Sequence, residues 1–314
     1  MSLTNINYNI HDKILLFKNI IKVLLIVFSI GIIIVKLSLK LQILICTIAK
    51  KENKYINEFV EHYLNLKITK IIIYDNNDIN GEDFYNILQK YIRKRLIKII
   101  NIRGIKRPQK KALNDCYKNN NKNYDWIGFY DIDEFLYINN YTNLNNFLSL
   151  SKFKKCQGLL INWKYYGDNN QVYYENKPVQ QRFIKIFPTE LLKKKIYYYS
   201  AAKSIIRGRL SIKWGHCPHY IKNIINCRAD GRIIKNYFSP PQYSIAYINH
   251  YITKSTEEFI ERINRGDVIL KVNNNYIENR IKNYYFFFNK ITKKKLYLFY
   301  KKLKYKINFK NFKF

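Results

Sequence analysis

Three carboxylates occur within four residues of this sequence, directly after an apolar run. The run covers residues 126–130, and the carboxylates belong to Asp131, Asp133 and Glu134, after which the chain becomes apolar again. Burying ionised carboxylates is costly unless a cation pairs with them. The carboxyl end of a buried strand is also where an α/β sheet binds its ligand. The pattern therefore predicts a divalent metal site, and the Asp-x-Asp spacing suits a metal that also carries a diphosphate.

Two interpretations of this cluster are open. In the first, Asp133 binds Mn²⁺ or Mg²⁺, which stabilises a leaving diphosphate as a Lewis acid, and Asp131 holds a ribose or a metal-bound water. In the second, the carboxylates form a surface turn, which the flanking apolar residues argue against. Asp75 also follows an apolar run, at residues 70–74. Asp75 could lie at the nucleotide crevice of a wound sheet and accept hydrogen bonds from a base or ribose, or it could form an Asx turn.

Histidines and cations late in the chain could complete such a site. Neutral imidazole is a common metal ligand, so His250 could join Asp133, and the HCPH string at 216–219 supplies two more histidines. A structural, hydrogen-bonded histidine is the alternative for each of them. Cations that could pair with diphosphate oxygens, or simply remain solvated, are Lys106, Arg107, Lys254 and Arg265. Gly266 follows Arg265 and lets the backbone turn closely there.

Alternating strands and helices must position these residues. Strands are expected at 41–48, 70–74, 96–102 and 126–130, with helices at 53–66 and 83–94 and a third that opens at Pro108. This regular alternation over residues 42–135 predicts a parallel, doubly wound sheet. Beyond it we expect strands at 158–163, 181–187 and 245–252, a hairpin within 205–214 around Gly208, and a helix at 256–263 capped by Ser255.

Composition limits the class of protein but does not select a ligand. The chain has 314 residues, 47% of them hydrophobic, which excludes a disordered protein and allows a sizeable core. A net charge of +34 favours anionic partners, but the excess of Lys, Asn, Ile, Tyr and Phe is also typical of an AT-rich genome. The five cysteines form no Cys-x-x-Cys pair and are odd in number. They predict reduced thiols and neither a disulfide framework nor a zinc site.

Both ends of the chain have features of membrane contact. Residues 23–35 carry no charge and are apolar apart from Ser29, too few for a span of about 20 residues, but extension to residue 39 adds only one charge, Lys36, which can reach the interface. We expect a membrane anchor in residues 1–40; a helix lying on the membrane or on the domain is the alternative. The tail 290–314 interleaves lysines with aromatic residues. It could contact anionic lipid or cover the domain as an amphipathic helix.

Seven strings of the sequence, taken in order, carry a resemblance. They are CTIAKKENKYINEFVEHY, KIIIYDNND, QKKALNDC, DWIGFYDIDEF, WKYYGDN, HCPH and NHYITKSTEEFIERINRGD. Together they resemble glycosyltransferase family 92 and related family 2-like proteins over about residues 42–268. The resemblance implies a single GT-A domain at 41–289, an α/β fold with a Rossmann-like, doubly wound mixed sheet. The hydrophobic helix precedes this domain and the basic tail follows it.

The resemblance also implies a function and a set of site residues. A metal-dependent transferase would move a sugar, most often from a UDP-linked donor, to a glycan or lipid-linked acceptor. The resemblance implies Asp131 and Asp133 for Mn²⁺ or Mg²⁺ and the nucleotide, and Glu52 and Asp75 for the nucleotide. From the residues themselves we add Asn77, Arg107, Gln109 and Arg265 for the nucleotide sugar, His250 for the metal, and Asp168 and Glu134 for catalysis. Asp168 is the candidate base that deprotonates the acceptor hydroxyl. Lys50-Lys51-Glu52 replaces the usual Lys-Asn-Glu and weakens the role of Glu52.

Other functions and the location of the domain stay open at this point. A metal-dependent nuclease or phosphotransferase would use the same acidic cluster, but it needs carboxylates around two metals, and no second cluster is evident in the sequence. A non-catalytic sugar- or membrane-binding protein is a third hypothesis. We expect a membrane-associated protein without a specific nucleic-acid partner and with its catalytic domain in the cytoplasm. The flanking lysines at both ends of the hydrophobic helix give no orientation.

Overall fold

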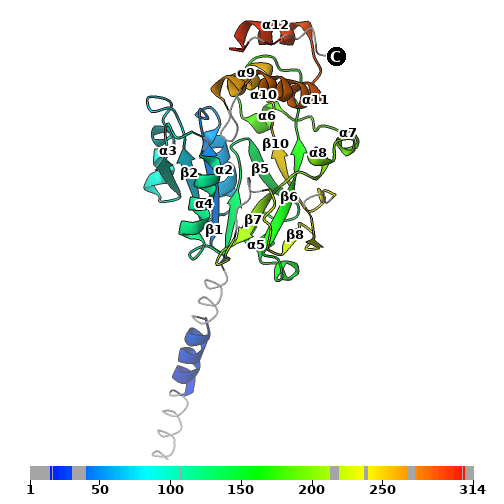
Figure 1. Cartoon of the computed structure of the whole chain (residues 1–314). Helices are drawn as coiled ribbons and strands as arrows, with labels where there is room; N and C mark the ends of the chain where they lie inside the picture. Colours follow the sequence, from blue (N-terminus) through cyan, green and yellow to red (C-terminus); the bar gives the residue numbers. More distant parts are fainter. Residues whose placement is uncertain are drawn as a thin grey trace, which may run out of the picture. The chain divides into compact units, whose positions relative to one another are not determined.

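A computed structural model describes residues 15, 17–29, 40–106, 108–212, 219–236, 240–266, 273–305 and 307 of the chain. It divides into two units, Met1–Leu41 and Gln42–Phe314 (Figure 1). In the first unit, residues 17–29 form a helix with exposed apolar side chains. No helix in the described ranges combines the length and the apolarity that a membrane span requires. Residues 30–39 of the expected anchor lie outside these ranges.

The second unit is built on a mixed sheet in the order β3-β2-β1-β4-β7-β6-β10-β5. Its parallel half contains β1 (Ile43–Ala49), β2 (Lys70–Asp75), β3 (Ile97–Asn101) and β4 (Trp126–Phe129). Its mixed half contains β5 (Glu134–Ile138), β6 (Gly158–Tyr165), β7 (Ala202–Arg207) and β10 (Ala246–His250), with β8 (Asn226–Arg228) and β9 (Ile233–Ile234) beside β6. The predicted α/β fold with a wound mixed sheet is confirmed.

Strand directions place many chain ends at one edge of the sheet. Strand β7 is antiparallel to both β4 and β6, and β10 is parallel to β6. The carboxyl ends of β1, β2, β4, β6 and β10 therefore all lie at the same edge. Strand β5 is antiparallel to β10, so both β5 and β7 begin at this edge. We call it the catalytic edge, because the side chains described below converge there.

Amphipathic helices cover the sheet as the sequence predicts. The helices of the parallel half are α2 (Ile56–Asn65), α3 (Phe84–Arg93) and α4 (Gln109–Asn120). Helix α4 buries Ala112, Leu113 and Cys116 against Leu44 and Ile72 of the sheet. Short helices follow at α5 (Leu144–Leu148), a 3₁₀ turn (Ser151–Phe153), α6 (Val179–Arg182), α7 (Thr189–Lys193) and α8 (Ile196–Ser200).

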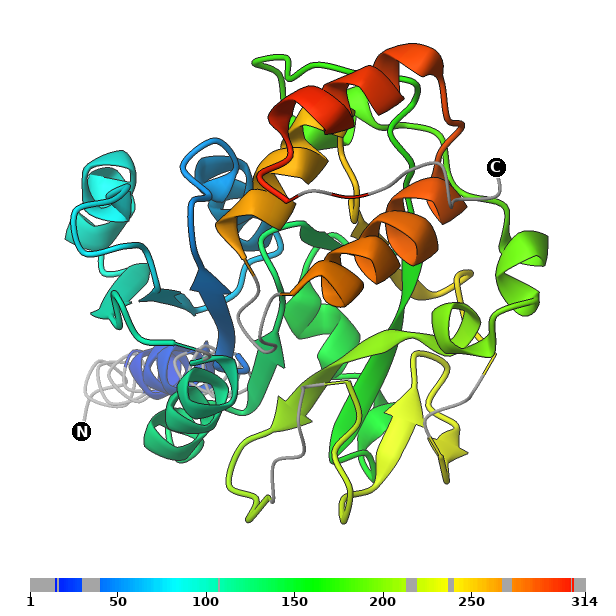
Figure 2. The same ribbon diagram turned by 45° about the horizontal axis from the view of Figure 1, so that its top comes forward.

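The C-terminal helices form a second core. They are α9 (Thr256–Arg265), α10 (Asn274–Arg280), a π-helix (Ile281–Tyr285), α11 (Phe286–Phe288) and α12 (Lys293–Lys302), and Figure 2 shows α9, α10 and α12 side by side. Phe259 of α9 packs with Tyr285 and Phe299. Helix α12, from the predicted basic tail, thus packs on the domain. Ser255 caps α9 as predicted, and its capping box with Glu258 satisfies two helix N-terminal amides.

Two local predictions are wrong. Residues 181–187 contain the end of α6 and an isolated bridge between Tyr166 and Ile186, and not a strand. No hairpin turns at Gly208, because β7 ends at Arg207 and pairs with β4 and β6. A Cβ on Gly208 would lie 1.9 Å from the Tyr124 carbonyl oxygen, so glycine is required there by close backbone approach.

The prediction of reduced thiols is also wrong for four of the five cysteines. Cys46 of β1 is bonded to Cys116 of α4, and Cys156 is bonded to Cys227 of β8. The pairs are separated by 70 and 71 residues in sequence. Spacing along the chain could not reveal them, because the winding of strands and helices brings the partners together. Cys217 lies outside the described residues.

Candidate active site

The acidic turn joins β4 to β5 at the catalytic edge. The Glu134 amide donates to the Asp131 carbonyl at 3.0 Å, and the Asp131 amide donates to Glu134 Oε2 at 3.1 Å. Asp133 and Glu134 are buried, with exposed fractions of 5% and 0%, while 41% of the Asp131 side chain is exposed. The buried carboxylates favour the metal-site interpretation over a surface turn.

A lysine that the sequence analysis did not single out neutralises part of this turn. Lys203, the second residue of β7, is buried and places Nζ 2.7 Å from Asp131 Oδ2 and 3.3 Å from Glu134 Oε1. Burial raises the pKa of Glu134 well above its ordinary range, although Lys203 acts in the opposite direction. The sequence signal that could have indicated this contact is the single lysine within the mostly apolar segment 201–206, since a lysine is rarely buried without a carboxylate partner.

Asp133 faces different cations. Arg262 of α9 donates from Nη1 to Asp133 Oδ2 at 2.7 Å, and His250 Nε2 lies 3.8 Å from Asp133 Oδ1. Burial alone would raise the pKa of Asp133, but Arg262, His250, Lys254 and Arg265 together hold it below the usual value. Arg262 was not predicted, although it precedes Arg265 by three residues and so shares its side of the helix.

His250 is suited to bind a metal. Burial lowers its pKa to about 3, so the imidazole is neutral at physiological pH despite the nearby Asp133. Ligand atoms of Asp133, Glu134 and His250 lie within 4.8 Å of one another. His250 Nδ1 is buried without a hydrogen-bond partner, and Glu134 Oε1 is paired with Lys203 Nζ at 3.3 Å. Two carboxylates and a neutral imidazole fit Mn²⁺ or Mg²⁺. Asp131, expected as a ligand, does not belong to this group.

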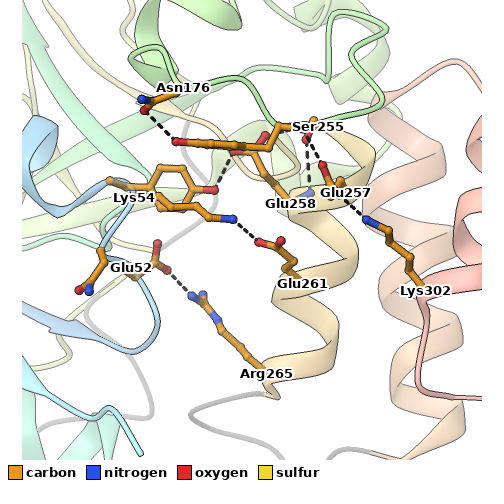
Figure 3. Close-up of polar contacts among 12 residues, drawn as sticks. Glu52, Lys54, Asn176, Ser255, Glu257, Glu258, Glu261, Arg265 and Lys302 are labelled. Atoms are coloured by element: carbon orange, nitrogen blue, oxygen red, sulfur yellow. Dashed lines mark hydrogen bonds and ion pairs between the residues drawn. The ribbon is translucent and has the colours of Figure 1, made fainter. Parts of the chain in front are cut away.

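The loop after β1 meets α9 through a set of charge pairs (Figure 3). Glu52 Oε1 accepts from Arg265 Nη1 at 2.5 Å, and Lys54 Nζ lies 2.8 Å from Glu261 Oε2. The Tyr55 hydroxyl donates to Glu258 at 2.7 Å. These residues, with Lys254 and Arg262, line a cavity of about 360 Å³. Glu52 and Arg265, both predicted for the nucleotide sugar, are thus in contact.

The end of β2 forms a separate polar group. Asp75 Oδ2 accepts from Arg103 Nε at 2.8 Å, and Asp75 Oδ1 accepts from the Asn77 amide at 2.9 Å. The second contact is the Asx turn considered above. Asn77 is fully buried and its Nδ2 lacks a partner, as does Oε1 of the buried Gln109. Both amides are therefore able to bind a ligand. Arg107 lies outside the described residues, as do His216 and Cys217 of the HCPH string.

Asp168, the candidate base, is held by the C-terminal helices. Its carboxylate lies 2.5 Å from Lys295 Nζ and accepts from the Tyr285 hydroxyl at 2.7 Å. The Asp168 amide donates to Asn289 Oδ1 at 2.5 Å. Asp168 and Lys295 are 2% and 1% exposed. A carboxylate enclosed in this way has little access to an acceptor, so its geometry fits fixation of the loop after β6 better than proton abstraction.

Comparisons with known proteins complete the description of the site. The model of glycosyltransferase family 92 matches residues 42–294. No match is found among curated proteins. Similar solved structures include S. aureus TarS 1–349 in complex with UDP, at 17% identity, a TM-score of 0.35, and coverage of 53% of this chain and 46% of that chain. A second structure of S. aureus TarS matches at 12% identity and a TM-score of 0.39, with coverage of 77% of this chain and 42% of that chain. The mannosyltransferase PcManGT from Pyrobaculum calidifontis in complex with GDP-Man and Mn²⁺ matches at 11% identity and a TM-score of 0.31, with coverage of 49% of this chain and 46% of that chain. This chain therefore covers less than half the length of these three structures.

Proposed function

The chain belongs to glycosyltransferase family 92, and from this premise we propose that it transfers a sugar from a UDP-linked donor to a hydroxyl of a glycan or lipid-linked acceptor, with Mn²⁺ or Mg²⁺. The observation that carries the proposal is the convergence of Asp133, Glu134 and His250 at the catalytic edge. Open α/β sheets bind their ligands at the carboxyl ends of their parallel strands, which lie at this edge. The proposal is therefore supported by the location of the residues as well as by their chemistry.

The proposed metal ligands are Asp133, Glu134 and His250. Bound there, the ion would supply Lewis-acid stabilisation of the negative charge on a leaving diphosphate. Asp131 remains paired with Lys203 and orients the turn through its backbone contacts with Glu134. We therefore propose that Asp131 has a positioning role. Glu134 is proposed as a ligand because its buried carboxylate lies within 4.8 Å of ligand atoms of Asp133 and His250.

Donor binding is proposed for two groups of residues at the same edge. Asp75 and Asn77, at the end of β2, would accept hydrogen bonds from, and donate them to, the base or ribose, and Gln109 at the start of α4 would assist. Arg262 and Arg265 would bind diphosphate oxygens after releasing Asp133 and Glu52. Arginine suits this role because its planar guanidinium forms paired hydrogen bonds with phosphate. Arg107 remains a sequence-based candidate for the same diphosphate.

The role expected for Asp168 and the cellular compartment expected for the domain are both revised. We propose a structural role for Asp168, which ties the loop after β6 to Lys295 and Tyr285. We also propose that the domain works in an oxidising compartment and not in the cytoplasm. Two disulfides in the domain support this, since such bonds persist mainly outside the cytosol. Membrane association through the N-terminal helix remains part of the proposal.

A nuclease or phosphotransferase is less well supported. Among the described residues, a single group of metal-ligating side chains is found, around Asp133. A two-metal mechanism needs carboxylates around both ions. This observation favours a site for one ion, as a sugar-diphosphate substrate requires.

A thermal-shift screen tests the proposed function. The full chain is melted with UDP-sugars and GDP-mannose, each with and without Mn²⁺. A ligand that binds only the native state raises the melting temperature by mass action, so a UDP-sugar should raise it only when Mn²⁺ is present. Equal shifts without the metal would contradict the metal-dependent part of the proposal. No shift with any donor would favour the non-catalytic hypothesis.

A further inference from the structure

Residues 184–196 expose aliphatic and basic side chains together. The exposed fractions are 68% for Ile184, 49% for Ile186, 42% for Leu191 and 55% for Ile196. The same segment contains four lysines and one glutamate: Lys185, Lys193, Lys194 and Lys195, with Glu190. Singly exposed apolar residues are ordinary on a protein surface, but four within thirteen residues of the chain suggest an interaction site.

This segment begins next to the catalytic edge. The Tyr166 amide, one residue past β6, donates to the His250 carbonyl at 3.1 Å. Ile186 forms a bridge with Tyr166, and the Phe187 amide donates to the Tyr165 carbonyl at 2.8 Å. One backbone hydrogen bond and one bridge thus connect Ile186 with the strand end that carries His250. A partner that covers residues 184–196 therefore lies beside the proposed reaction site.

An aromatic base supports the segment. Phe187 packs against Phe287 and Phe288, with ring centroids 5.1 and 4.9 Å apart. Tyr198 of α8 stacks on Phe287 at 5.5 Å, and Leu192 of α7 is buried. Figure 1 shows α7 and α8 at the margin of the domain, near α11. The inward side of the segment is therefore occupied by packing, while its four aliphatic side chains keep 42–68% of their surface exposed.

We propose that residues 184–196 dock on the surface of an anionic lipid bilayer. The charge of the segment complements lipid phosphates, and each lysine near such a surface adds to the attraction. The aliphatic side chains would enter the boundary between headgroups and acyl chains, as they do in interfacial helices. Docking holds the carboxyl ends of β6 and β10 close to the membrane. The docked position then assigns the acceptor to a lipid-linked molecule that resides in the membrane. This assignment of the acceptor rests on the proposed function.

Tryptophan substitutions test the docking in the full chain. Ile184→Trp and Ile196→Trp place a fluorophore in the segment, and Ile233→Trp in β9 is the matched control. Ile233 is 57% exposed and lies on the strand pair that joins the opposite end of β6, at Gly158–Leu160. Each variant is mixed with vesicles of phosphatidylcholine and phosphatidylglycerol that contain brominated acyl chains, and the quenching of the parent chain is subtracted.

The proposal predicts quenching in the segment that exceeds the control by at least about threefold, because interfacial side chains contact the acyl boundary. Replacement of phosphatidylglycerol with phosphatidylcholine should remove most of it, and so should Lys193→Glu with Lys194→Glu. Equal quenching at Ile233, no quenching at either position while the chain is bound to vesicles, or quenching unaffected by both charge changes would overturn the proposal. The assay contains no nucleotide, so its failure is distinct from a failure of the thermal-shift screen.

Discussion

At the scale of residues, the acidic turn consists of two electrostatic groups. Lys203 pairs with Asp131 and Glu134, whereas Arg262 and His250 face Asp133. The two groups have different consequences. In the first, Lys203 and Glu134 are buried and fix the conformation of the turn, and Glu134 is also a proposed metal ligand. The second is formed by groups that a metal and a diphosphate would rearrange, and it therefore belongs to the proposed chemistry.

Removal of Lys203 should destabilise the fold. Lys203→Met removes the cation beside Asp131 and the buried Glu134; an uncompensated buried charge typically costs about 3–5 kcal/mol of unfolding free energy, and protonation of Glu134, whose pKa is already raised, sets this as the upper limit. Adding Glu134→Gln removes the unpaired charge and should recover a large part of this loss. Urea unfolding of both variants measures the effect. If Lys203→Met alone is as stable as the wild type, the buried pair does not hold the turn.

A partly buried histidine outside the site should make stability depend on pH. His62 of α2 lies 2.8 Å from the Leu136 carbonyl oxygen, and burial lowers its pKa to about 4. Between pH 4 and 6.5 the unfolded chain binds a proton that the folded chain does not, so stability falls as pH falls through this range. The maximal loss from one such group is about 3 kcal/mol. His62→Gln should flatten the dependence in denaturant titrations at pH 7, 5.5 and 4.5, and an unchanged slope would refute this assignment.

At the scale of elements, strand direction assembles the site. His250 ends β10, Glu134 begins β5, Lys203 is the second residue of β7 and Asp75 ends β2, yet all four lie at the catalytic edge. Helix α9 then supplies Arg262 and Arg265 from one side. The capping box at Ser255 fixes where this helix begins and thus where its arginines point.

The disulfides should contribute strongly to stability. Each closes a loop of about 70 residues, for which loss of unfolded-chain entropy predicts about 4 kcal/mol. The double replacement Cys156→Ala with Cys227→Ala should lower the unfolding free energy by a value of that order. Thiol titration of the denatured, unreduced protein should find one free thiol, because four of five cysteines are bonded. Five free thiols would contradict the pairing.

At the scale of the whole molecule, the wound half of the fold was predictable and the mixed half only in part: the strands β6 and β10 and helix α9 were expected, whereas β5 and β7 were not. Apolar runs and helical periodicity located β1 to β4 and α2 to α4, because each repeat is set by local sequence. The expected strand at 181–187 is absent because Phe187 packs on Phe287 and Phe288, and the segment pairs with the end of β6 only through the isolated bridge at Tyr166. Asp133 and His250 were predictable from residue type and strand position. Lys203 and the partners of Asp168 were not, since their contacts join residues distant in sequence.

The central claim is that Asp133 belongs to a metal site for a nucleotide sugar. The most direct test measures Mn²⁺-dependent release of the nucleotide from the donor that the thermal-shift screen selects, with Asp133→Asn compared with Asp230→Asn. Asp230 is a suitable control because it is also ion-paired, with 12% of its side chain exposed against 7% for Asp133, and it lies in the β8–β9 turn. We expect Asp133→Asn to lower turnover by at least about 100-fold while the chain stays folded, and Asp230→Asn to retain it. Full turnover in folded Asp133→Asn would contradict the account.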